Sequence, residues 1–382
     1  MTNLLAPLQS LKQGHWFKLI CGASYQHLPA VRSLTLAYTL AGADCIDVAA
    51  DPAVIFAAQE ALVVAKTLAK NAEERGFGFK GDLPLLMVSL NDGEDPHFRK
   101  AKFDAHNCPL DCPRPCEKIC PAQAIVFNNI KDSFSGIIAK KCYGCGRCLP
   151  VCPYEMIDTA SDVSTPGAIA PLIMSTGIDA IEIHTKVGRL AEFQRLWTAI
   201  APWADKLKLI AISCNDAEGL IDYLQAIYDV IAPRPQVLIW QTDGRSMSGD
   251  IGDGTTIAAI KLGQKVLAAN LPGYVQLAGG TNSYTVPKLK TMGLLQGWGD
   301  GEMGRWGEKI TPPPYHPTTP SIAGVAYGSY ARVLLSSVLE PLEHKEVNST
   351  GFQANPRLED EPAILWQAVE LAHSLVSQIK SQ

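Results

Sequence analysis

Eight of the chain's 11 cysteines lie in one segment, between residues 108 and 152. The second half of this segment has the spacing C-x2-C-x2-C-x3-C-P, formed by Cys142, Cys145, Cys148, Cys152 and Pro153. Bacterial ferredoxins bind their clusters with this spacing, because three neighbouring thiolates reach one cluster and the fourth reaches a second one. The segment therefore predicts iron–sulfur clusters, and with them redox chemistry or redox sensing.

The first half of the segment departs from this spacing. Cys108, Cys112, Cys116 and Cys120 keep the terminal x3-C-P, which ends at Pro121, but both earlier gaps are three residues long. Two alternatives follow for this half: a 4Fe-4S cluster, or a three-iron or labile cluster from which one ligand is displaced. Four-cysteine zinc sites also use C-x2–4-C pairs. The intact second half and the two Cys-Pro endings nevertheless favour iron–sulfur clusters.

The order of the two halves matches a two-cluster ferredoxin, in which the fourth cysteine of each run binds the other cluster. By this crossover rule one cluster is expected on Cys108, Cys112, Cys116 and Cys152, and the other on Cys142, Cys145, Cys148 and Cys120. We therefore expect a ferredoxin-like unit with two clusters of the 4Fe-4S type, apart from the alternative left open for the first.

Outside the cysteines, short apolar runs alternate with amphipathic stretches, which is typical of repeated strand–helix units. The expected strands are Phe17–Gly22, Cys45–Ala50, Leu85–Leu90, Ala180–His184, Leu207–Ser213, Val237–Gln241, Tyr274–Ala278 and Gly324–Gly328. The expected helices are Pro29–Ala41, Ala53–Glu73, Gly167–Ser175, Leu190–Ile200, Glu218–Ile231, Thr255–Ala269, Val286–Leu295, Ala331–Leu342 and Pro362–Lys380. Eight such units predict a (β/α)8 barrel, with an open doubly wound α/β sheet as the alternative. We expect the barrel in residues 1–103 and 159–345, the ferredoxin-like insert in 104–158, and a C-terminal linker and helix in 346–382.

An insert after the third strand would emerge on the C-terminal face of the barrel, where barrel active sites lie. The clusters would then stand beside the barrel mouth. Polar side chains in or at the ends of strands are candidate mouth residues, namely Lys18, Asp47, Glu182, His184 and Gln241. Lys18, Asp47 and Glu182 could form a buried charged layer, which is either a structural ion cluster or part of a functional site.

Two glycine-rich positions suggest a ligand at the same mouth. Gly279, Gly280, Thr281 and Asn282 follow the seventh strand, and Gly328 and Ser329 end the eighth. Barrels commonly bind phosphate at these positions, because backbone N–H groups there point at the anion. The sequence thus allows a flavin or another phosphorylated ligand. The alternative is that the Gly-Gly pair simply ends a strand. Residues 297–320 are rich in Gly and Pro and are expected to form a surface loop rather than a lid.

The charge balance argues against nucleic acid as a partner, and the hydropathy argues against a membrane-spanning segment. Lys and Arg total 33 against 38 Asp and Glu, and no basic stripe occurs, so nucleic acid is not an expected partner. The most apolar helical stretch, Ala53–Ala69, contains Gln59, Glu60 and Lys66, so no transmembrane segment is expected. We expect a cytoplasmic protein. Because disulfides are rare in that compartment, the many cysteines of the chain indicate metal binding or redox chemistry.

Four segments carry a resemblance to a known family. Trp16–Ser24, Leu40–Pro52, Cys108–Pro153 and Gln276–Asn282 together resemble the light-dependent period (LdpA) family of cyanobacteria. The resemblance implies an iron–sulfur protein on the input side of the circadian clock, which reports the redox state set by photosynthetic light. It also implies partners among the clock input proteins, such as histidine kinases.

Two functional hypotheses follow from the sequence, and a third is simpler. In the first, the chain is a redox sensor in which the state of a cluster changes the contacts with a protein partner. In the second, it is an oxidoreductase that passes electrons from the two clusters to a flavin or substrate at the barrel mouth. In the third, it is an electron-carrier adaptor without a ligand. The resemblance favours a sensor over a catalyst.

Overall fold

The fold is described from a computed structural model of the chain. The structure describes residues 6–22, 28–93, 99–120, 123–128, 134–139, 141–142, 148–161, 170–171, 173–245, 251–252, 254–295, 321–345, 347–348, 351–352 and 357–380. The predicted loop at 297–320 and Cys145 lie outside these residues.

Eight parallel strands close into a barrel in the order β1-β12-β11-β10-β9-β8-β3-β2. Their bounds are β1 Trp16–Ile20, β2 Cys45–Ala49, β3 Leu85–Asn91, β8 Ala180–Thr185, β9 Leu209–Asn215, β10 Leu238–Asp243, β11 Tyr274–Ala278 and β12 Ile322–Tyr327. The last strand pairs with the first, with Trp16 opposite Gly324. The predicted barrel is therefore confirmed, and the open sheet is wrong.

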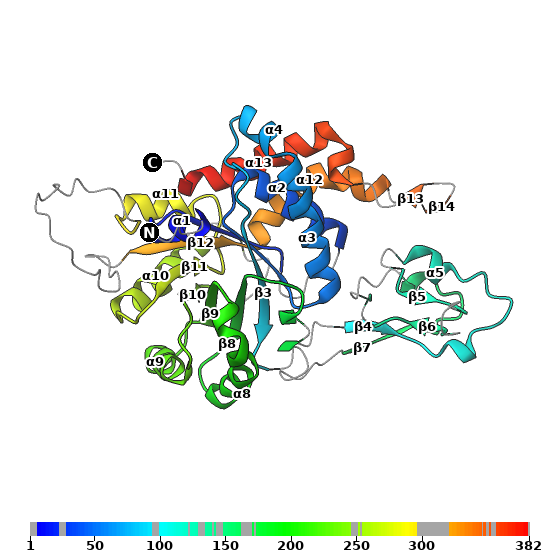
Figure 1. The fold of residues 1–382 in the computed structure, drawn as a ribbon, viewed down its shortest axis with the longest axis horizontal. Helices are drawn as coiled ribbons and strands as arrows, with labels where there is room; N and C mark the ends of the chain where they lie inside the picture. Colours follow the sequence, from blue (N-terminus) through cyan, green and yellow to red (C-terminus); the bar gives the residue numbers. More distant parts are fainter. Residues whose placement is uncertain are drawn as a thin grey trace, which may run out of the picture.

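Helices surround the barrel (Figure 1). Their bounds are α1 Ala6–Lys12, α2 Leu28–Ala41, α3 Pro52–Thr67, α4 Ala69–Glu74, α8 Leu190–Ile200, α9 Leu220–Val230, α10 Thr255–Ala268, α11 Thr285–Thr291, α12 Ser329–Lys345 and α13 Pro362–Lys380. The 3-10 segments η2 (Ala201–Lys206) and η3 (Leu358–Asp360) follow α8 and precede α13. The short strands β13 (Val347–Asn348) and β14 (Gly351–Phe352) pair with each other between α12 and η3.

Two predicted helices differ from those observed. One helix was expected over 53–73, but the chain breaks at Leu68, where φ is −98° and ψ is 2°. The helix expected over 286–295 ends at Thr291, because Gly293 adopts a φ of 64° and its N–H bonds to the carbonyl of Lys290. A glycine in this left-handed conformation is a common helix C-cap, so the sequence held a signal for this end.

The strand alternation divides the core into two layers. Side chains such as Ile46, Val48 and Ile181 face outward and pack against the helices. Side chains such as Met87 and Ala211 face inward and fill the end of the barrel at which the strands begin. Because each strand side chain alternates between these faces, an inward polar residue lies among apolar neighbours.

The insert leaves the barrel after β3 and returns before β8. Its elements are β4 (Arg99–Lys102), η1 (Ala105–Asn107), α5 (Pro115–Ile119), β5 (Ile125–Val126), β6 (Gly136–Ile137), α6 (Cys148–Val151) and β7 (Asp158–Ser161). Strands β4 and β7 pair antiparallel and join the two ends of the insert, while β5 pairs with β6. Figure 1 shows the insert projecting beside α3. Of the helix expected over 167–175, residues 170–171 and 173–174 are helical, and 167–169 and 172 lie outside the description.

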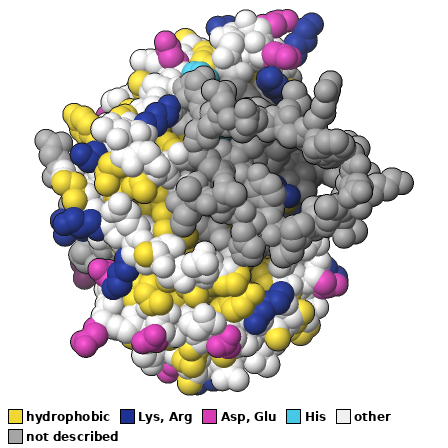
Figure 2. All heavy atoms as spheres, turned by 90° about the vertical axis from the view of Figure 1, so that its left-hand side faces the viewer, with side chains coloured by type: hydrophobic (Ala, Val, Ile, Leu, Met, Phe, Trp, Pro, Cys, Tyr) yellow, Lys and Arg dark blue, Asp and Glu magenta, His cyan; other side chains and the backbone are white. Residues whose placement is uncertain are grey.

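On one face of the molecule, the described side chains do not gather into a basic patch. Figure 2 shows basic and acidic side chains interspersed on the face that lies to the left in Figure 1. Among the described residues, no helix is both long and apolar enough to cross a membrane.

A bidentate ion pair joins the C-terminal segment to helix α2. Arg32 on α2 donates from Nη1 to Glu359 Oε2 at 2.8 Å and from Nη2 to Oε1 at 2.5 Å. Their side chains are 10% and 16% exposed. Burial alone would raise the pKa of Glu359, but the Arg32 guanidinium holds this pKa below its usual value. The ionised pair therefore stabilises the fold only while Glu359 is deprotonated.

We expect Glu359→Gln to lower the free energy of unfolding by about 1–3 kcal/mol at pH 7, because a hydrogen-bonded ion pair is lost. A carboxyl with a depressed folded pKa loses its stabilising effect as the pH falls through that value, so the difference from the wild type should be complete above the usual glutamate pKa of about 4.3 and should shrink as the pH falls below it. Urea unfolding at several pH values measures this. The exposed Glu370→Gln on α13 is the control. A difference that stayed constant between pH 7 and pH 3.5 would contradict the ion-pair account.

Candidate metal centre

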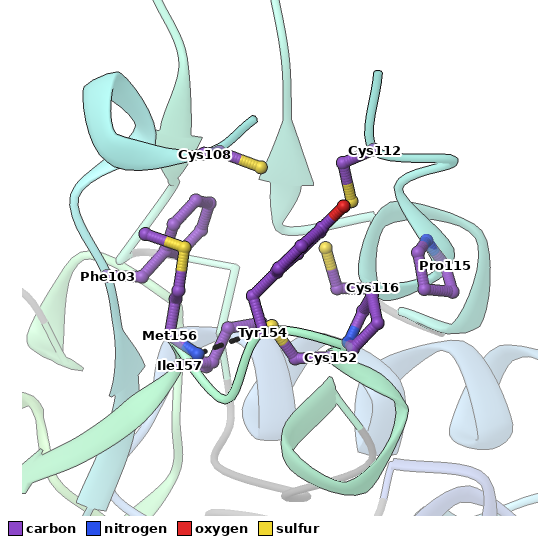
Figure 3. Close-up of a pocket in the computed structure, with 10 residues that line it drawn as sticks. Phe103, Cys108, Cys112, Pro115, Cys116, Cys152, Tyr154, Met156 and Ile157 are labelled. Atoms are coloured by element: carbon purple, nitrogen blue, oxygen red, sulfur yellow. Dashed lines mark hydrogen bonds between the residues drawn. The ribbon is translucent and has the colours of Figure 1, made fainter. Parts of the chain in front are cut away.

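Four thiols of the insert line one pocket. Cys108, Cys112, Cys116 and Cys152 surround it together with Phe103, Pro115, Pro153, Tyr154, Met156 and Ile157, and Figure 3 shows the four sulfur atoms around the Tyr154 ring. These are the four cysteines that the crossover rule assigns to one cluster. The arrangement brings Cys152, from the second run, to the three cysteines of the first.

Local structure places each of these cysteines. Cys108 caps the C-terminus of η1, and Cys116 lies in the first turn of α5. The turn into α5 is made by Arg114, which has a φ of 53° and precedes Pro115 at the first helical position. Pro115 suits that position because its ring fixes φ at a helical value. Cys152 directly follows α6.

The four thiols of the pocket fit an iron–sulfur cluster by their chemistry. Burial raises the pKa of Cys116 to about 11, and burial with the neighbouring Cys112 raises the pKa of Cys108. Cys108 and Cys116 would therefore bind a metal centre only with release of their protons, because a cluster takes its ligands as thiolates. Four thiolates in an apolar lining are the donor set of a cubane cluster.

The two Cys-Pro endings have the same backbone geometry. The residue three positions after each cysteine, Gln123 or Glu155, adopts a positive φ of 48° or 51°. The N–H one residue later donates to the cysteine sulfur: Ala124 to Cys120 at 3.2 Å and Met156 to Cys152 at 3.4 Å. Hydrogen bonds to cluster sulfurs raise the reduction potential. The stretched first run therefore keeps the same ending as the regular second run.

The remaining predicted ligands are described in part. Cys120 caps α5, Cys148 begins α6, and Cys142 follows a turn in which its N–H donates to the carbonyl of Ile138 at 3.1 Å. Cys116 and Cys148 are buried with Ile125 and Ile157 in the small core of the insert. Since Cys145 lies outside the described residues, the second ligand set stays a prediction.

A lysine links the insert to the barrel mouth. Lys100 Nζ on β4 lies 3.4 Å from Asp51 Oδ2, just after β2, and donates to the carbonyl of Ala139 at 2.8 Å. The insert therefore contacts the C-terminal face of the barrel, the expected face. Sequence reasoning did not single out this pair, because 49 residues separate its members and neither lies in a motif.

The barrel interior holds the charged layer that the strands suggested. Lys18 Nζ lies 2.9 Å from Asp47 Oδ2, contacts Glu182 Oε2, and donates to Gln241 Oε1 at 3.1 Å. The side chains of Lys18 and Glu182 are fully buried. Burial alone would lower the pKa of Lys18, but the carboxylates of Asp47 and Glu182 raise it. Lys18 is thus a cation at neutral pH and no nucleophile.

The pKa values of the two carboxyl groups in this layer, Asp47 and Glu182, are shifted in opposite directions. Burial raises the pKa of Asp47 to about 6, whereas Lys18 and His184 overcome the effect of burial on Glu182 and lower its pKa. His184 Nε2 lies 3.2 Å from Glu182 Oε1 and its side chain is 28% exposed. The structure therefore brings together all five candidate mouth residues, with His184 on the side of the mouth.

Several members of the layer were missed from the sequence. Ser89 donates to both oxygens of Asp47, Gln276 Nε2 donates to Gln241 Oε1 at 2.6 Å, and Gln241 Nε2 lies 3.3 Å from both Ser213 Oγ and Asp243 Oδ1. Each lies on the inward face of an otherwise apolar strand. Period-two alternation within the predicted strands would have found Ser89, Ser213 and Gln276.

The glycine-rich loop after β11 packs within the protein. A Cβ on Gly279 would lie 2.7 Å from the carbonyl oxygen of Arg245, and one on Gly280 would lie 3.0 Å from the Thr255 side chain. Thr281 Oγ1 donates to the carbonyl of Ala326, and Asn282 Oδ1 accepts from Thr256 Oγ1 at 2.9 Å.

At the end of β12, a Cβ on Gly328 would make ordinary van der Waals contacts, the nearest with Arg332 Nη1 at 3.6 Å, and Ser329 Oγ accepts from Arg332 Nη2 at 2.9 Å. Close packing thus accounts for the two loop glycines, and the predicted phosphate or flavin site remains a prediction.

The fold and this site define a (β/α)8 barrel protein with an inserted iron–sulfur cluster-binding unit. Two family models match the chain: the LdpA Fe-S cluster-binding domain over residues 108–163 and the light dependent period A C-terminal domain over residues 172–378. Light dependent period A of Synechococcus elongatus is 45% identical over 98% of this chain and 94% of its own length. The chain belongs to the light dependent period A family.

Solved structures resemble the chain only weakly. Two structures of tryptophan synthase from M. tuberculosis are each 12% identical, with TM-scores of 0.41 and 0.43. They cover 98% and 99% of this chain, and this chain covers 98% of each of them. Likenesses of this size carry no argument about function.

We expect Lys18→Met to lower the free energy of unfolding by about 3–5 kcal/mol, because it leaves Asp47 and Glu182 as uncompensated buried charges. Adding Asp47→Asn and Glu182→Gln to this variant should restore part of the loss. The control is Lys186→Met, at an exposed position directly after β8, which should change the free energy of unfolding by less than about 0.5 kcal/mol. Urea unfolding measures all four proteins. A Lys18→Met protein as stable as the control would show that the layer is not electrostatically coupled.

Proposed function

We propose that this chain is an iron–sulfur redox sensor that relays the light-dependent redox state of the cell to the circadian clock through protein partners. The observation that carries the proposal is the pocket lined by Cys108, Cys112, Cys116 and Cys152, on an insert that contacts the barrel mouth through Lys100. The relative from Synechococcus elongatus is called light dependent period A, and we extend that role to this chain.

The proposal includes two clusters of the 4Fe-4S type, of which the cluster on Cys108, Cys112 and Cys116 is the candidate for a three-iron form. A bound cluster supplies one-electron chemistry. The residues of the chain hold it through thiolates, exclude water with Phe103 and Ile157, and donate N–H groups to the sulfurs. These contacts set how readily the cluster is reduced. The sensing partners are clock input proteins such as histidine kinases, and the location is the cytoplasm.

Cysteine variants test the cluster assignment. Cys116→Ser and Cys152→Ser should each reduce the iron and sulfide content of protein purified without oxygen, because a thiolate ligand is removed. Cys214→Ser is the matched control: Cys214 is buried in β9, outside the insert, and should not affect iron. Iron content that was unchanged in the first two variants would contradict the ligand assignment.

Partner binding tests the sensing. Oxidised and dithionite-reduced protein should bind a clock input histidine kinase with affinities that differ at least about fivefold, the lower end of typical allosteric coupling. Calorimetry under argon measures both affinities, and the Cys116→Ser variant should show a smaller difference. Equal affinities in the two states would contradict a redox sensor while leaving the iron–sulfur assignment intact.

One observation favours the second candidate, an oxidoreductase with a flavin or substrate at the barrel mouth. His184 pairs with the buried Glu182 and is partly exposed, and a carboxylate that orients an imidazole is a common acid–base arrangement. Absorbance and fluorescence of anaerobically purified protein decide between the candidates, since bound flavin supports the enzyme and cluster bands alone support the sensor.

A further inference from the structure

Arg114 has a backbone conformation that a long side chain rarely adopts. It lies between Pro113 and Pro115 in the gap from Cys112 to Cys116, which is one residue longer than the corresponding gap of the regular run. Its φ of 53° and ψ of 52° are left-handed, a region that glycine and asparagine adopt more readily. Such an outlier points to a role that the side chain itself provides.

The guanidinium of Arg114 lies on an aromatic pair that leads to the thiol pocket. Its Cζ is 4.2 Å from the centroid of the Phe127 ring, which is a cation–π contact. The Phe127 ring centroid is in turn 5.8 Å from that of Phe103. Phe103 and Pro115 both line the pocket of the four thiols (Figure 3). The cation is therefore held one ring behind the pocket wall.

The positive charge acts on a sulfur of the pocket. Burial and the neighbouring Cys112 raise the pKa of Cys108, and the charge of Arg114 opposes them. The same attraction applies to any further negative charge that the thiolates and a bound cluster carry. Because arginine does not deprotonate in proteins, this charge is present whatever the pH.

We propose that Arg114 raises the reduction potential of the cluster bound by Cys108, Cys112, Cys116 and Cys152, by holding a fixed positive charge behind the pocket wall. This inference rests on the proposed function and specifies which residue sets the redox state at which the sensor responds. Reduction by a one-electron donor oxidises the donor by one electron, forms and breaks no bond, and adds one negative charge inside the pocket. The guanidinium stabilises that charge and so favours the reduced form, for a four-iron and a three-iron cluster alike.

Neutral variants that keep the left-handed turn test the proposal. Arg114→Asn and Arg114→Gly remove the charge, and both new side chains tolerate a positive φ. Each should lower the midpoint potential by about 59 mV, a tenfold change in the ratio of reduced to oxidised cluster for one electron. Coulomb's law gives a shift of this order for a unit charge roughly 10 Å away at an effective dielectric constant of about 20. Arg114→Lys keeps the charge and should stay close to the wild type.

The experiment is an EPR-monitored redox titration of the full chain, purified without oxygen, with iron and sulfide measured for each variant. The signal to follow is the one that Cys116→Ser removes. Lys118→Gln is the matched control, because it removes a charge from an exposed position on the same helix, where water weakens the interaction. It should shift the potential by less than half as much.

A lower potential in the two neutral variants of Arg114, with the iron content of the wild type, supports the proposal. If one of them loses iron, the other carries the test. Unchanged potentials overturn the proposal, because a merely structural role in the turn would leave the potential of the loaded protein where it is. An equal shift in Lys118→Gln, or in Arg114→Lys, also overturns it. Loss of iron from both neutral variants would assign Arg114 to cluster assembly and overturn its role in the potential.

The same variants separate this inference from the proposed function. If the potential stays unchanged while the redox state still alters binding of the histidine kinase, the sensor function stands and only the role of Arg114 fails. If the potential falls but oxidised and reduced protein bind the kinase equally, the role of Arg114 stands and the sensor function fails. Wild-type protein that purifies without iron in the absence of oxygen overturns both.

Discussion

The insert depends on its own cysteines for its structure. Among its described residues, the fully buried core cluster consists of Cys116, Ile125, Cys148 and Ile157, and two of these four side chains are predicted cluster ligands. So small a core cannot by itself offset the entropy of ordering the chain. Metal–thiolate bonds would supply the missing free energy. Under the proposed function, the bonds that hold the clusters would also hold the unit folded, and cluster loss would be a structural event as well as a chemical one.

The barrel holds the insert at the face where its parallel strands end. Parallel strands end at one face, and the insert follows β3 on that face and contacts Asp51 beside β2. Inside the barrel, Lys18, Asp47 and Glu182 form a buried charged layer that ends in the partly exposed His184. Buried charges of this kind stabilise a fold poorly, which makes a functional role for the layer worth testing.

The sequence predicted the parts of the molecule that repeat or follow a spacing rule. The barrel followed from eight apolar runs, and α8 and α13 were predicted with the observed bounds because an amphipathic period marked them. The cysteine spacing grouped the four thiols that line the pocket.

Contacts between distant segments were not predictable in the same way. The Lys100–Asp51 pair and the Arg32–Glu359 pair join residues that no motif connects, and their pairing depends on tertiary packing. The break at Leu68 likewise has no residue that signals it.

The central claim is that the insert holds two iron–sulfur clusters through its cysteines. Native mass spectrometry of protein purified without oxygen tests it most directly, because cluster type and number both appear in the mass. We expect an added mass equal to two cubane clusters, or one cubane and one three-iron cluster, that disappears on acid treatment. A mass that corresponded to zinc ions, or to the bare chain under conditions that keep other iron–sulfur proteins intact, would contradict it.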